Sequence, residues 1–514
     1  MIRRTRKVRF SINTNPARSK EVQIRTLEKL LSRSRNTAFG QEYRFNDILN
    51  SKDIYSAFAS NVPNGDYLNM LPWWDRSRSG EKDVTWPGKV DYFALSSGTS
   101  DGSSKYIPVS PEMLKYIRRG SLRQILAIAG TDVPKDHITK NWLMVGGSTA
   151  LDFNGIFHFG DLSGITTANI PGVLQRISKP EPDIRSSKDW RSKIKRITLE
   201  AENWDVGMIA GVPAWIQLLL ENIIEHYKVD NIHDIWPNLE VYIHGGVSLK
   251  PYRKSINKLL GRPIKYFETY LASEGFIALQ TRQNADGGMR LLLRGGIFFE
   301  FVPFNDQNFN EHGEILPNPK ILPLWEIKEG LEYALLLSTC SGAWRYLIGD
   351  TVRFTNLKKN ELVITGRTKH FISLCGEHLS VDNMNQAVQL LGEKYATDFN
   401  EFTVGAISVK KSFGHQWFLP NNGLNLDPEQ VSKDLDAFLC ELNDDYAVER
   451  KHALKTIKVQ LIPDNCFLGW MTHRGKISAQ SKFPRVLKGQ LLKQWRDYLL
   501  ENEVSLEDFD VAHR

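Results

Sequence analysis

"LSSGTSDGSSKY", residues 95–106, contains eight Ser, Thr and Gly residues and then a lysine. The apolar run Tyr92–Leu95 at its start predicts a strand that ends in this loop. Glycine lets the backbone turn several N–H groups toward one point, and the hydroxyls and Lys105 add donors and charge. The spacing differs from that of a Walker P-loop, because Gly98 and Gly102 are too close together and Lys105 follows two serines. By itself the stretch fits a flexible turn better than a phosphate-binding loop.

Two stretches in the middle of the chain place small or polar residues directly after predicted strands. In "HGGVSLKPY", residues 244–252, a glycine pair separates a predicted strand from a predicted helix. In "TYLASEG", residues 269–275, Glu274 follows a strand end, where a carboxylate is suited to hold Mg²⁺. Taken alone, an ordinary strand-to-helix turn and a capping or solvated glutamate are the simpler explanations.

Two later stretches also place a charged residue directly after an apolar run and a glycine. "WRYLIGDTVRF", residues 344–354, carries Asp350 between two apolar runs, and an aspartate there suits the two hydroxyls of a ribose. "ITGRTKHFISLCGEHLS", residues 364–380, has Arg367 just after a strand and a glycine, where it can meet a nucleotide between domains. A hairpin turn and a surface arginine in a linker explain each of them singly. The order and spacing of all the stretches together are more informative than any one of them.

The bulk composition is that of a globular protein of two or three domains. The chain has 514 residues, of which 41% are hydrophobic and 24% charged, and its net charge is +7. This mild excess suits anionic small molecules as well as nucleic acid. No apolar run approaches the length of a membrane span. The four cysteines are widely spaced with no C-x-x-C pair, which indicates neither a zinc site nor a disulfide framework and fits the cytoplasm; they are Cys340, Cys375, Cys440 and Cys466.

The first twenty residues are strongly basic and have no acid before Glu21. They lack the apolar core of a signal peptide, so a solvated terminal segment is favoured over a basic arm that binds nucleic acid or membrane. Residues 21–40 predict an amphipathic helix that stops at Gly40.

The middle of the chain alternates short apolar runs with helical patterns, which predicts an α/β fold of helix-covered sheets. Strands are expected within 141–147, 238–246, 264–270 and 331–339, and helices over 212–227 and 249–260. The later part predicts a smaller, mobile α+β domain with strands within 402–410 and 456–463 and a helix over 428–443. We therefore expect a large domain over 1–366 and a small domain over 367–514, with a hinge near 366–369.

In sequence order, "SSGTSDGSSK", "GGVSL", "YLASEG", "GD" and "GRTKHFISLCGE" resemble the blocks of the adenylate-forming superfamily of acyl-CoA ligases, luciferases and peptide-synthetase adenylation domains. Within it the chain most resembles the acyl-acid amido synthetases of the Gretchen Hagen family. The closer match rests on "NTAFGQEYRF", "FFEFVPF", "CSGAWRYLIGD" and "AQSKFPRVLK", and it covers residues 21 to about 490. The chain departs from the pattern at His370, where the superfamily often has an acid, and at Leu347-Ile348, where the family often has a second arginine.

The resemblance implies an ATP-dependent ligase that uses Mg²⁺. It assigns Ser96, Ser97, Gly98, Thr99 and Ser100 to the ATP phosphates, with Lys105 supporting the loop or its charge. It places Gly245, Gly246 and Val247 beside adenine and assigns Tyr270, Ser273 and Glu274 to the nucleotide site, with Glu274 as the metal ligand. Asp350 and Arg367 are implied to hold the ribose.

The implied reaction transfers AMP to a carboxylic acid and then passes the acyl group to an amine, with an amino acid as the favoured acceptor, so that an amide forms. Positioned donors, a metal and a lysine stabilise the negative charge that gathers on the α-phosphate. By the family match this lysine is Lys482, in preference to Lys476, which resembles the late lysine of acyl-CoA ligases. The resemblance further implies that the large domain (1–366) binds ATP and the acyl group, and that the small domain (367–514) is a lid that pivots near Lys369 between the two steps.

Two alternatives stay open at this point. An acyl-CoA ligase with a thiol acceptor would share most of the motifs. A non-catalytic protein that binds nucleotide or nucleic acid would need a concentrated basic face, which is absent beyond residue 20. The expected partners are therefore small-molecule substrates and not nucleic acid, and a monomer is compatible with the sequence. For the acyl group, residues 158–167 and 299–301 are candidates by resemblance alone, and both suit a core equally well.

Overall fold

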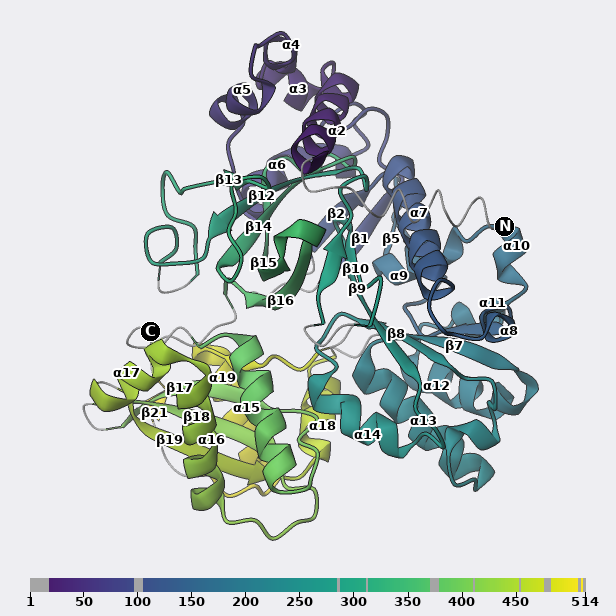
Figure 1. Ribbon diagram of the computed structural model, residues 1–514, viewed down its shortest axis with the longest axis vertical. Helices are drawn as coiled ribbons and strands as arrows, with labels where there is room; N and C mark the ends of the chain where they lie inside the picture. The colour runs from purple at the N-terminus through teal and green to yellow at the C-terminus, as the bar shows by residue number, and fades with distance from the viewer. Residues whose placement is uncertain are drawn as a thin grey trace. The chain divides into compact units, whose positions relative to one another are not determined.

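The computed structural model describes residues 18–96, 105–283, 287–310, 313–369, 379–409, 412–452, 454–475, 482–506 and 510–511. It divides into two compact units (Figure 1). Unit 1 comprises Met1–Gly246, Leu260–Phe304 and Asn318–Ile364, and unit 2 comprises Val247–Leu259, Asn305–Pro317 and Thr365–Arg514. Of the residues assigned above to the ATP phosphates and to catalysis, Ser97, Gly98, Thr99, Ser100 and Lys476 lie outside the described ranges.

A 12-stranded sheet forms the centre of unit 1. Its strands follow the order β13 (Leu322–Pro323), β12 (Ile297–Pro303), β14 (Glu332–Thr339), β15 (Tyr346–Asn356), β16 (Glu361–Arg367), β11 (Met289–Leu291), β10 (Gly275–Leu279), β9 (Lys265–Ala272), β8 (Val241–Gly245), β7 (Val206–Gly211), β3 (Asn141–Met144) and β6 (Ser178–Lys179). The strands from β6 to β9 pair in parallel, whereas β9 pairs antiparallel with β10. The parallel part places the carboxyl ends of β3, β7 and β8 at one edge, where ligands collect in α/β sheets.

Apolar runs and helical periodicity explain these elements. The strands expected within 141–147, 238–246, 264–270 and 331–339 are confirmed as β3, β8, β9 and β14. The helix expected over 212–227 is confirmed as α13 (Pro213–Tyr227), which buries one apolar face. The helix expected over 249–260 is confirmed in its central part, where the 3-10 turn η4 (Lys250–Tyr252) runs directly into α14 (Arg253–Lys258).

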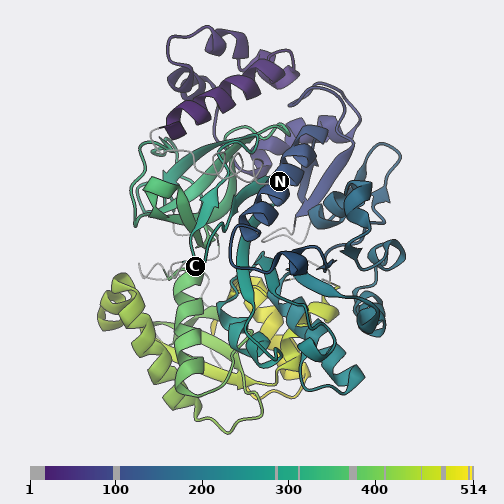
Figure 2. The same cartoon turned by 45° about the vertical axis from the view of Figure 1, so that its right-hand side comes forward.

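A second sheet of unit 1 has the order β2 (Lys105–Val109), β1 (Tyr92–Ser96), β5 (His158–Gly160) and β4 (Asp152–Phe153). The helices α2 (Ser19–Ser34), α3 (Ala38–Glu42), α4 (Phe45–Leu49) and α5 (Ile54–Asn61) gather at one end of unit 1 and appear in purple in both views (Figures 1 and 2). The buried faces of these helices join the core that also contains β12 and β14.

The prediction that one helix runs over 21–40 and stops at Gly40 is wrong in its last part. Helix α2 ends at Ser34, and Gly40 lies inside the separate helix α3. The Thr37 hydroxyl caps α3 by accepting from the Gly40 N–H at 3.0 Å. A Cβ at Gly40 would lie 2.0 Å from the carbonyl oxygen of Ser34, so glycine permits a close backbone approach there and does not end the helix.

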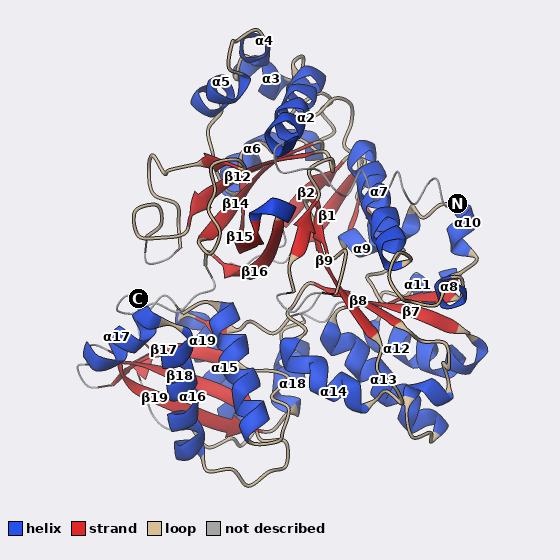
Figure 3. Ribbon diagram, in the orientation of Figure 1, coloured by secondary structure: helices blue, strands red, loops and turns tan. Residues whose placement is uncertain are grey.

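Unit 2 is a 5-stranded sheet with helices on both faces (Figure 3). Its main path runs β19 (Leu454–Ile462), β18 (Ser412–Pro420), β17 (Thr403–Val409) and β20 (Val486–Leu487), and β21 (Asp510–Val511) pairs with β17. Alternate residues of β18 explain the two layers, because Trp417 packs in the core with α15 (Val381–Lys394) and α16 (Pro428–Leu442) while Phe418 packs with α18 (Asn465–His473) and α19 (Gly489–Glu501). The strands and helix expected within 402–410, 456–463 and 428–443 are confirmed as β17, β19 and α16.

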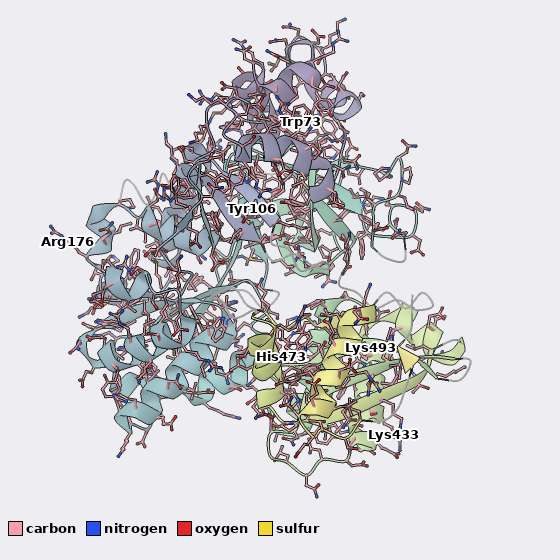
Figure 4. All side chains as sticks on the ribbon, turned by 180° about the vertical axis from the view of Figure 1, so that it is seen from behind. Trp73, Tyr106, Arg176, Lys433, His473 and Lys493 are labelled. Carbon is pink, nitrogen blue, oxygen red and sulfur yellow. The ribbon has the colours of Figure 1, made fainter. Side chains whose placement is uncertain are left out.

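Viewed from behind, α18 and α19, which carry His473 and Lys493, cover the near face of the unit 2 sheet (Figure 4). No helix among the described residues is long and apolar enough to cross a membrane. The chain therefore has the mixed α/β architecture expected from its sequence, with a large sheet unit and a smaller second unit.

Candidate active site

The serine- and glycine-rich stretch is flanked by the two strands of a hairpin in unit 1. Ser96 ends β1 and lies opposite Lys105, the first residue of the antiparallel strand β2. The Lys105 ammonium lies 5.5 Å from the ring centre of Tyr67, whose hydroxyl accepts from the Tyr106 N–H at 3.1 Å. These contacts attach the base of the hairpin to α6 (Tyr67–Arg78), and the pairing of β1 with β2 places Ser96 opposite Lys105.

The glycine pair lies at the carboxyl end of β8. Gly245 faces Thr269 of β9, and a Cβ at Gly245 would lie 2.4 Å from the Thr269 carbonyl oxygen. Gly246 has φ +85°, a left-handed conformation that favours glycine. The turn therefore needs both glycines, and it leaves backbone free of side chains beside the strand that carries Tyr270. Val247 is the first residue of the next segment, which belongs to unit 2.

A hydrogen bond joins two of the residues assigned to the nucleotide. The Tyr270 hydroxyl on β9 donates to Asp350 Oδ2 at 2.6 Å. Gly349 and Asp350 lie inside β15 and not in a hairpin turn. The pairing of β14 with β15 shifts register between Ala334 and Leu336, and Gly349 has φ +86°, so the strand bulges at this point. Such a bulge re-aims side chains, and here it places the Asp350 carboxylate on Tyr270.

Ser273 and Glu274 form the two-residue turn between β9 and β10, and Glu274 is only 8% exposed. The part of the chain that the structure describes holds no group of three or more His, Cys, Asp or Glu side chains arranged for a metal ion. A single carboxylate nevertheless fits Mg²⁺, since that ion commonly takes one or two protein carboxylates and completes its shell with substrate phosphates and water.

A buried ion pair supports the bulge that carries Asp350. Arg345 donates from Nε to Glu300 Oε2 and from Nη2 to Glu300 Oε1, both at 3.0 Å, and the side chains are 5% and 1% exposed. Its Nη1 donates to the carbonyls of Ala59 and Val62, both at 2.8 Å. Arg345 has φ +41°, which non-glycine residues rarely adopt. The pair thus holds a strained residue at the start of β15 and joins it to β12.

The motif stretches around Glu300 and Arg345 were recognised in the sequence, but their pairing was not. Phe299 and Phe301, which flank Glu300, are fully buried in the core of unit 1. A glutamate between two aromatic residues of a buried strand is the sequence signal that Glu300 needs a cationic partner.

In unit 2, Lys482 directly precedes a segment whose side chains are packed in place. Phe483 packs against Phe467, Trp470 and Trp495, with ring centres 4.9, 5.2 and 5.1 Å away. Arg485 places its guanidinium carbon 4.4 Å from the ring centre of Phe402. Its carbonyl accepts from the Val404 N–H at 2.9 Å, which continues into the pairing of β20 with β17. Lys482 itself is exposed at the start of this anchored segment.

Arg485 also belongs to a polar network that the sequence did not reveal. Its Nη1 donates to Glu401 Oε2 at 2.6 Å, and the Tyr252 hydroxyl donates to Glu401 Oε1. Further donations from Arg485 reach the carbonyls of Phe402 at 3.1 Å and Asn400 at 3.3 Å. Burial and the neighbouring Glu401 charge raise the pKa of Tyr252, so its hydroxyl stays a donor. Tyr252 lies in the segment that follows the glycine pair, and only the fold connects it with Glu401.

The region considered for the acyl group contains charge as well as apolar residues. Asp161 follows β5, and burial raises the pKa of its carboxyl group. Lys193 on α12 (Trp190–Glu200) is buried and donates to the Gly146 carbonyl at 3.2 Å, just beyond the end of β3. Burial lowers the pKa of Lys193 to about 8.

The structure therefore brings together Ser96 with Lys105, Gly245 with the strand of Tyr270, and Tyr270 with Asp350, all in unit 1. Arg367 ends β16 and, like Val247 and Lys482, belongs to unit 2.

Three family domains match successive parts of the chain. The GH3 family N-terminal domain matches residues 11–152, the GH3 family central domain residues 290–367, and the GH3 family C-terminal domain residues 381–490. Together they match well over half of the chain. The glycine pair and Glu274 lie between the first two matches.

Similar proteins cover nearly the whole chain at low identity. A jasmonoyl–L-amino acid synthetase, JAR6, of Nicotiana attenuata is 20% identical over 537 residues, covering 90% of each chain. An indole-3-acetic acid-amido synthetase, GH3.10, of Arabidopsis thaliana is 26% identical over 519 residues, covering 84% of this chain and 85% of the relative.

Solved structures share the fold. The AtGH3.15 acyl acid amido synthetase in complex with 2,4-DB superposes with a TM-score of 0.74 at 18% identity, covering 96% of this chain and 95% of that one. A 2-hydroxyisobutyryl-CoA ligase in the postadenylation state has a TM-score of 0.62 at 12% identity, covering 95% and 93%.

Proposed function

Because the chain belongs to the GH3 family of acyl-acid amido synthetases, we propose that it joins a carboxylic acid to an amino acid at the expense of ATP. It is a carbon–nitrogen ligase of the adenylate-forming superfamily. The observation that carries the proposal is the match of all three GH3 domains, in order, to one chain that also holds the motif blocks between them.

In the first step a carboxylate oxygen of the acid attacks the α-phosphorus of ATP. The bond between the α-phosphorus and the bridging oxygen breaks, pyrophosphate leaves, and an acyl-adenylate forms. Ser96 to Ser100 hold the phosphates, and Lys105 supports the loop from the start of β2. Glu274 would hold Mg²⁺, which would supply positive charge to offset that of the phosphates.

The nucleotide is held by the turn after β8 and by the bulge in β15. Gly245, Gly246 and Val247 border adenine, where the missing side chains of the glycines admit a flat ring. Asp350 accepts from a ribose hydroxyl, and the 2.6 Å hydrogen bond from Tyr270 fixes that carboxylate. Ser273 completes the turn beside Glu274, and Arg367 is the proposed second contact to the ribose.

Lys482 stabilises the α-phosphate and the acyl carboxylate during adenylation. A long lysine side chain loses conformational entropy when it is positioned, so an anchored backbone lowers the cost of reaching the phosphate. Phe483 and Arg485 supply that anchor. After adenylation, unit 2 pivots near residues 366–369, which removes Lys482 and admits the acceptor.

In the second step the neutral amine of the amino acid attacks the acyl carbon. The C–O bond to AMP breaks, AMP leaves, and the amine proton goes to solvent or base, so that the product is an amide. This step runs downhill because the acyl-phosphate anhydride is a far better acyl donor than a carboxylate.

The described cysteines Cys340, Cys440 and Cys466 are free thiols, which supports a cytoplasmic location. One chain carries all the residues named for the reaction, so we propose that a monomer suffices for activity.

A pyrophosphate-exchange screen over carboxylic acids tests the first step. We expect at least one acid to promote incorporation of labelled pyrophosphate into ATP, and the Lys482→Ala variant to lose this exchange. Normal exchange in Lys482→Ala together with loss in Lys476→Ala would reassign the catalytic lysine to Lys476.

The acceptor is tested with the acid that the screen identifies. We expect AMP release to depend on an amino acid and an amide to appear by mass spectrometry. Formation of a thioester with coenzyme A and no amide with any amino acid would contradict the proposal.

A further inference from the structure

A buried lysine and a partly exposed aspartate contact the same glycine turn of unit 1, just beyond β3. The Lys193 ammonium donates to the Gly146 carbonyl oxygen at 3.2 Å. A Cβ at Gly147 would lie 2.6 Å from the Asp161 carboxylate, so that side chain rests on the next residue of the turn. Because Gly146 and Gly147 share one peptide bond, the two charged groups are neighbours in the fold.

Neither charge has a direct ionic partner among the residues that the structure describes. Lys193 is 2% exposed, and the Gly146 carbonyl is its single hydrogen-bond acceptor there. Asp161 stands at the N-cap of α9 (Leu162–Ala168), but its carboxylate does not cap that helix. Burial raises the pKa of the Asp161 carboxyl group and lowers that of the Lys193 ammonium to about 8, and each effect is partly offset by the charge of the other group. Unpaired charges away from water are costly, so the pair is suited to a ligand that brings both opposite charges.

The register of β1 with β5 places Asp161 beside the start of the serine- and glycine-rich stretch. The two strands run parallel, and Ala94 pairs with Gly160 (Figure 1). Asp161 follows Gly160 directly, and Ser96 comes two residues after Ala94 at the same end of this sheet. The turn at Gly146 follows the carboxyl end of β3 in the 12-stranded sheet. Carboxyl ends of strands from both sheets therefore meet at the charge pair, which is where α/β folds bind ligands.

The opposite charges of the pair discriminate among the small molecules of the proposed reaction. A carboxylic acid would satisfy Lys193 but would place a second anion beside Asp161, and the phosphates of ATP would do the same. An amino acid zwitterion carries an ammonium group and a carboxylate on one carbon. It is the reactant whose charges match both side chains.

We propose that Asp161 and Lys193 bind the acceptor amino acid as its zwitterion, an assignment that rests on the proposed amide-forming function. The α-ammonium group donates to Asp161, and the α-carboxylate accepts from Lys193. The bound ammonium releases one proton to solvent before its neutral nitrogen attacks the acyl carbon. This places the nucleophile beside the loop proposed for the phosphates, where the acyl-adenylate forms.

Acceptors with and without the α-carboxylate test the assignment. AMP release is measured, with the acid that the exchange screen identifies, on a mixture of the common L-amino acids and on the matching mixture of amino acid amides, which keep the amine but lack the carboxylate charge. The unaltered protein should reach half of its maximal rate at an at least about tenfold lower concentration of the free amino acids than of the amides.

Two variants separate the two charges. Lys193→Met should raise the half-saturating concentration of the free amino acids by about tenfold or more and leave that of the amides unchanged, so that the preference disappears. Asp161→Asn keeps the shape of the side chain and should raise both concentrations. Lys195→Met is the matched control, because it removes the same charge from the exposed side of α12 and should change neither concentration.

Pyrophosphate exchange distinguishes failure of this assignment from failure of the proposed function, because the first step needs no acceptor. Loss of exchange in folded Lys193→Met and Asp161→Asn would place the pair at the acid or at ATP and overturn the assignment. An unchanged half-saturating concentration of the free amino acids in folded Lys193→Met would overturn it as well. Absence of exchange in the unaltered protein with every acid would overturn the proposed function and this assignment with it.

Discussion

Two arginine–glutamate pairs, one in each unit, are built from the same parts. Arg345 with Glu300 and Arg485 with Glu401 both add a tyrosine hydroxyl, from Tyr55 and Tyr252, and both direct remaining donors to backbone carbonyls. Each arginine also lies over a phenylalanine ring. Each stands close in sequence to a proposed active-site residue, since Asp350 follows Arg345 and Lys482 precedes Arg485.

The pairs differ in how far water is excluded. The side chains of Arg345 and Glu300 are 5% and 1% exposed and share two hydrogen bonds of 3.0 Å. Those of Arg485 and Glu401 are 12% and 25% exposed and share one of 2.6 Å. We therefore expect the first pair to hold the fold of unit 1, and the second mainly to position a short, less buried segment of unit 2.

The largest effect is expected from breaking the unit 1 pair. Arg345→Ala leaves the Glu300 carboxylate buried without its partner and should destabilise the protein by about 3–5 kcal/mol. Urea unfolding followed by tryptophan fluorescence measures this loss. A loss below about 1 kcal/mol would show that this pair is not structural, contrary to its burial.

Breaking the unit 2 pair should cost less stability and more activity. Arg485→Gln is expected to lower the free energy of unfolding by about 2 kcal/mol, because solvent screens the more exposed carboxylate. Pyrophosphate exchange should nevertheless fall by more than about tenfold, through kcat with little change in KM for ATP. Arg485→Lys keeps the positive charge and should restore part of the exchange. If both variants fold and lose exchange equally, the shape of the guanidinium and not its charge is what positions the segment.

The tyrosine hydroxyls of the two pairs should also differ in their contribution to stability. Tyr252→Phe removes a hydroxyl that is within hydrogen-bond distance of both Glu401 and Arg485, and about 1–2 kcal/mol of stability should be lost. Tyr55→Phe removes a bond of 3.4 Å to Glu300, and less than about 1 kcal/mol should be lost. Thermal melts of the two variants under the same conditions give the ranking, and a reversed order would contradict it.

A further small effect concerns Lys193, a buried cation that has no carboxylate at hydrogen-bond distance among the residues that the structure describes. Its pKa falls from the ordinary value of 10.5 to about 8 because of burial. The unfolded chain therefore binds more protons between these values, so stability should rise with pH, by about 1 kcal/mol between roughly pH 7.5 and 9. Lys193→Met should remove this rise, which is measured as the difference between the pH profiles of the two proteins.

The main strands were predictable because each is a short apolar run bounded by glycine or polar residues. This holds for β3, β8, β9 and β14, and for the turn at Gly245 and Gly246, where the conformation requires glycine. Gly40 shows the limit of such local reasoning. A glycine can serve a close approach between segments, which sequence does not distinguish from a helix stop.

Partners that lie far apart in the chain could not be predicted. Tyr252 and Glu401 are 149 residues apart, and Arg345 and Glu300 are 45 apart. Their contacts depend on strand register and on which segment packs in which unit, and a shift of one residue would turn each side chain to the other face. The bulge at Asp350 is of the same kind, because an irregularity between two strands has no signature in either strand alone.

We propose that the Arg485–Glu401 pair holds Lys482 in place for adenylation. The most direct test is the rate of ATP–pyrophosphate exchange in Arg485→Gln, measured below its melting temperature beside Lys482→Ala and the unaltered protein. The exchange rate of Arg485→Gln is expected to fall close to that of Lys482→Ala while the variant remains folded. Exchange at the unaltered rate in folded Arg485→Gln would contradict it.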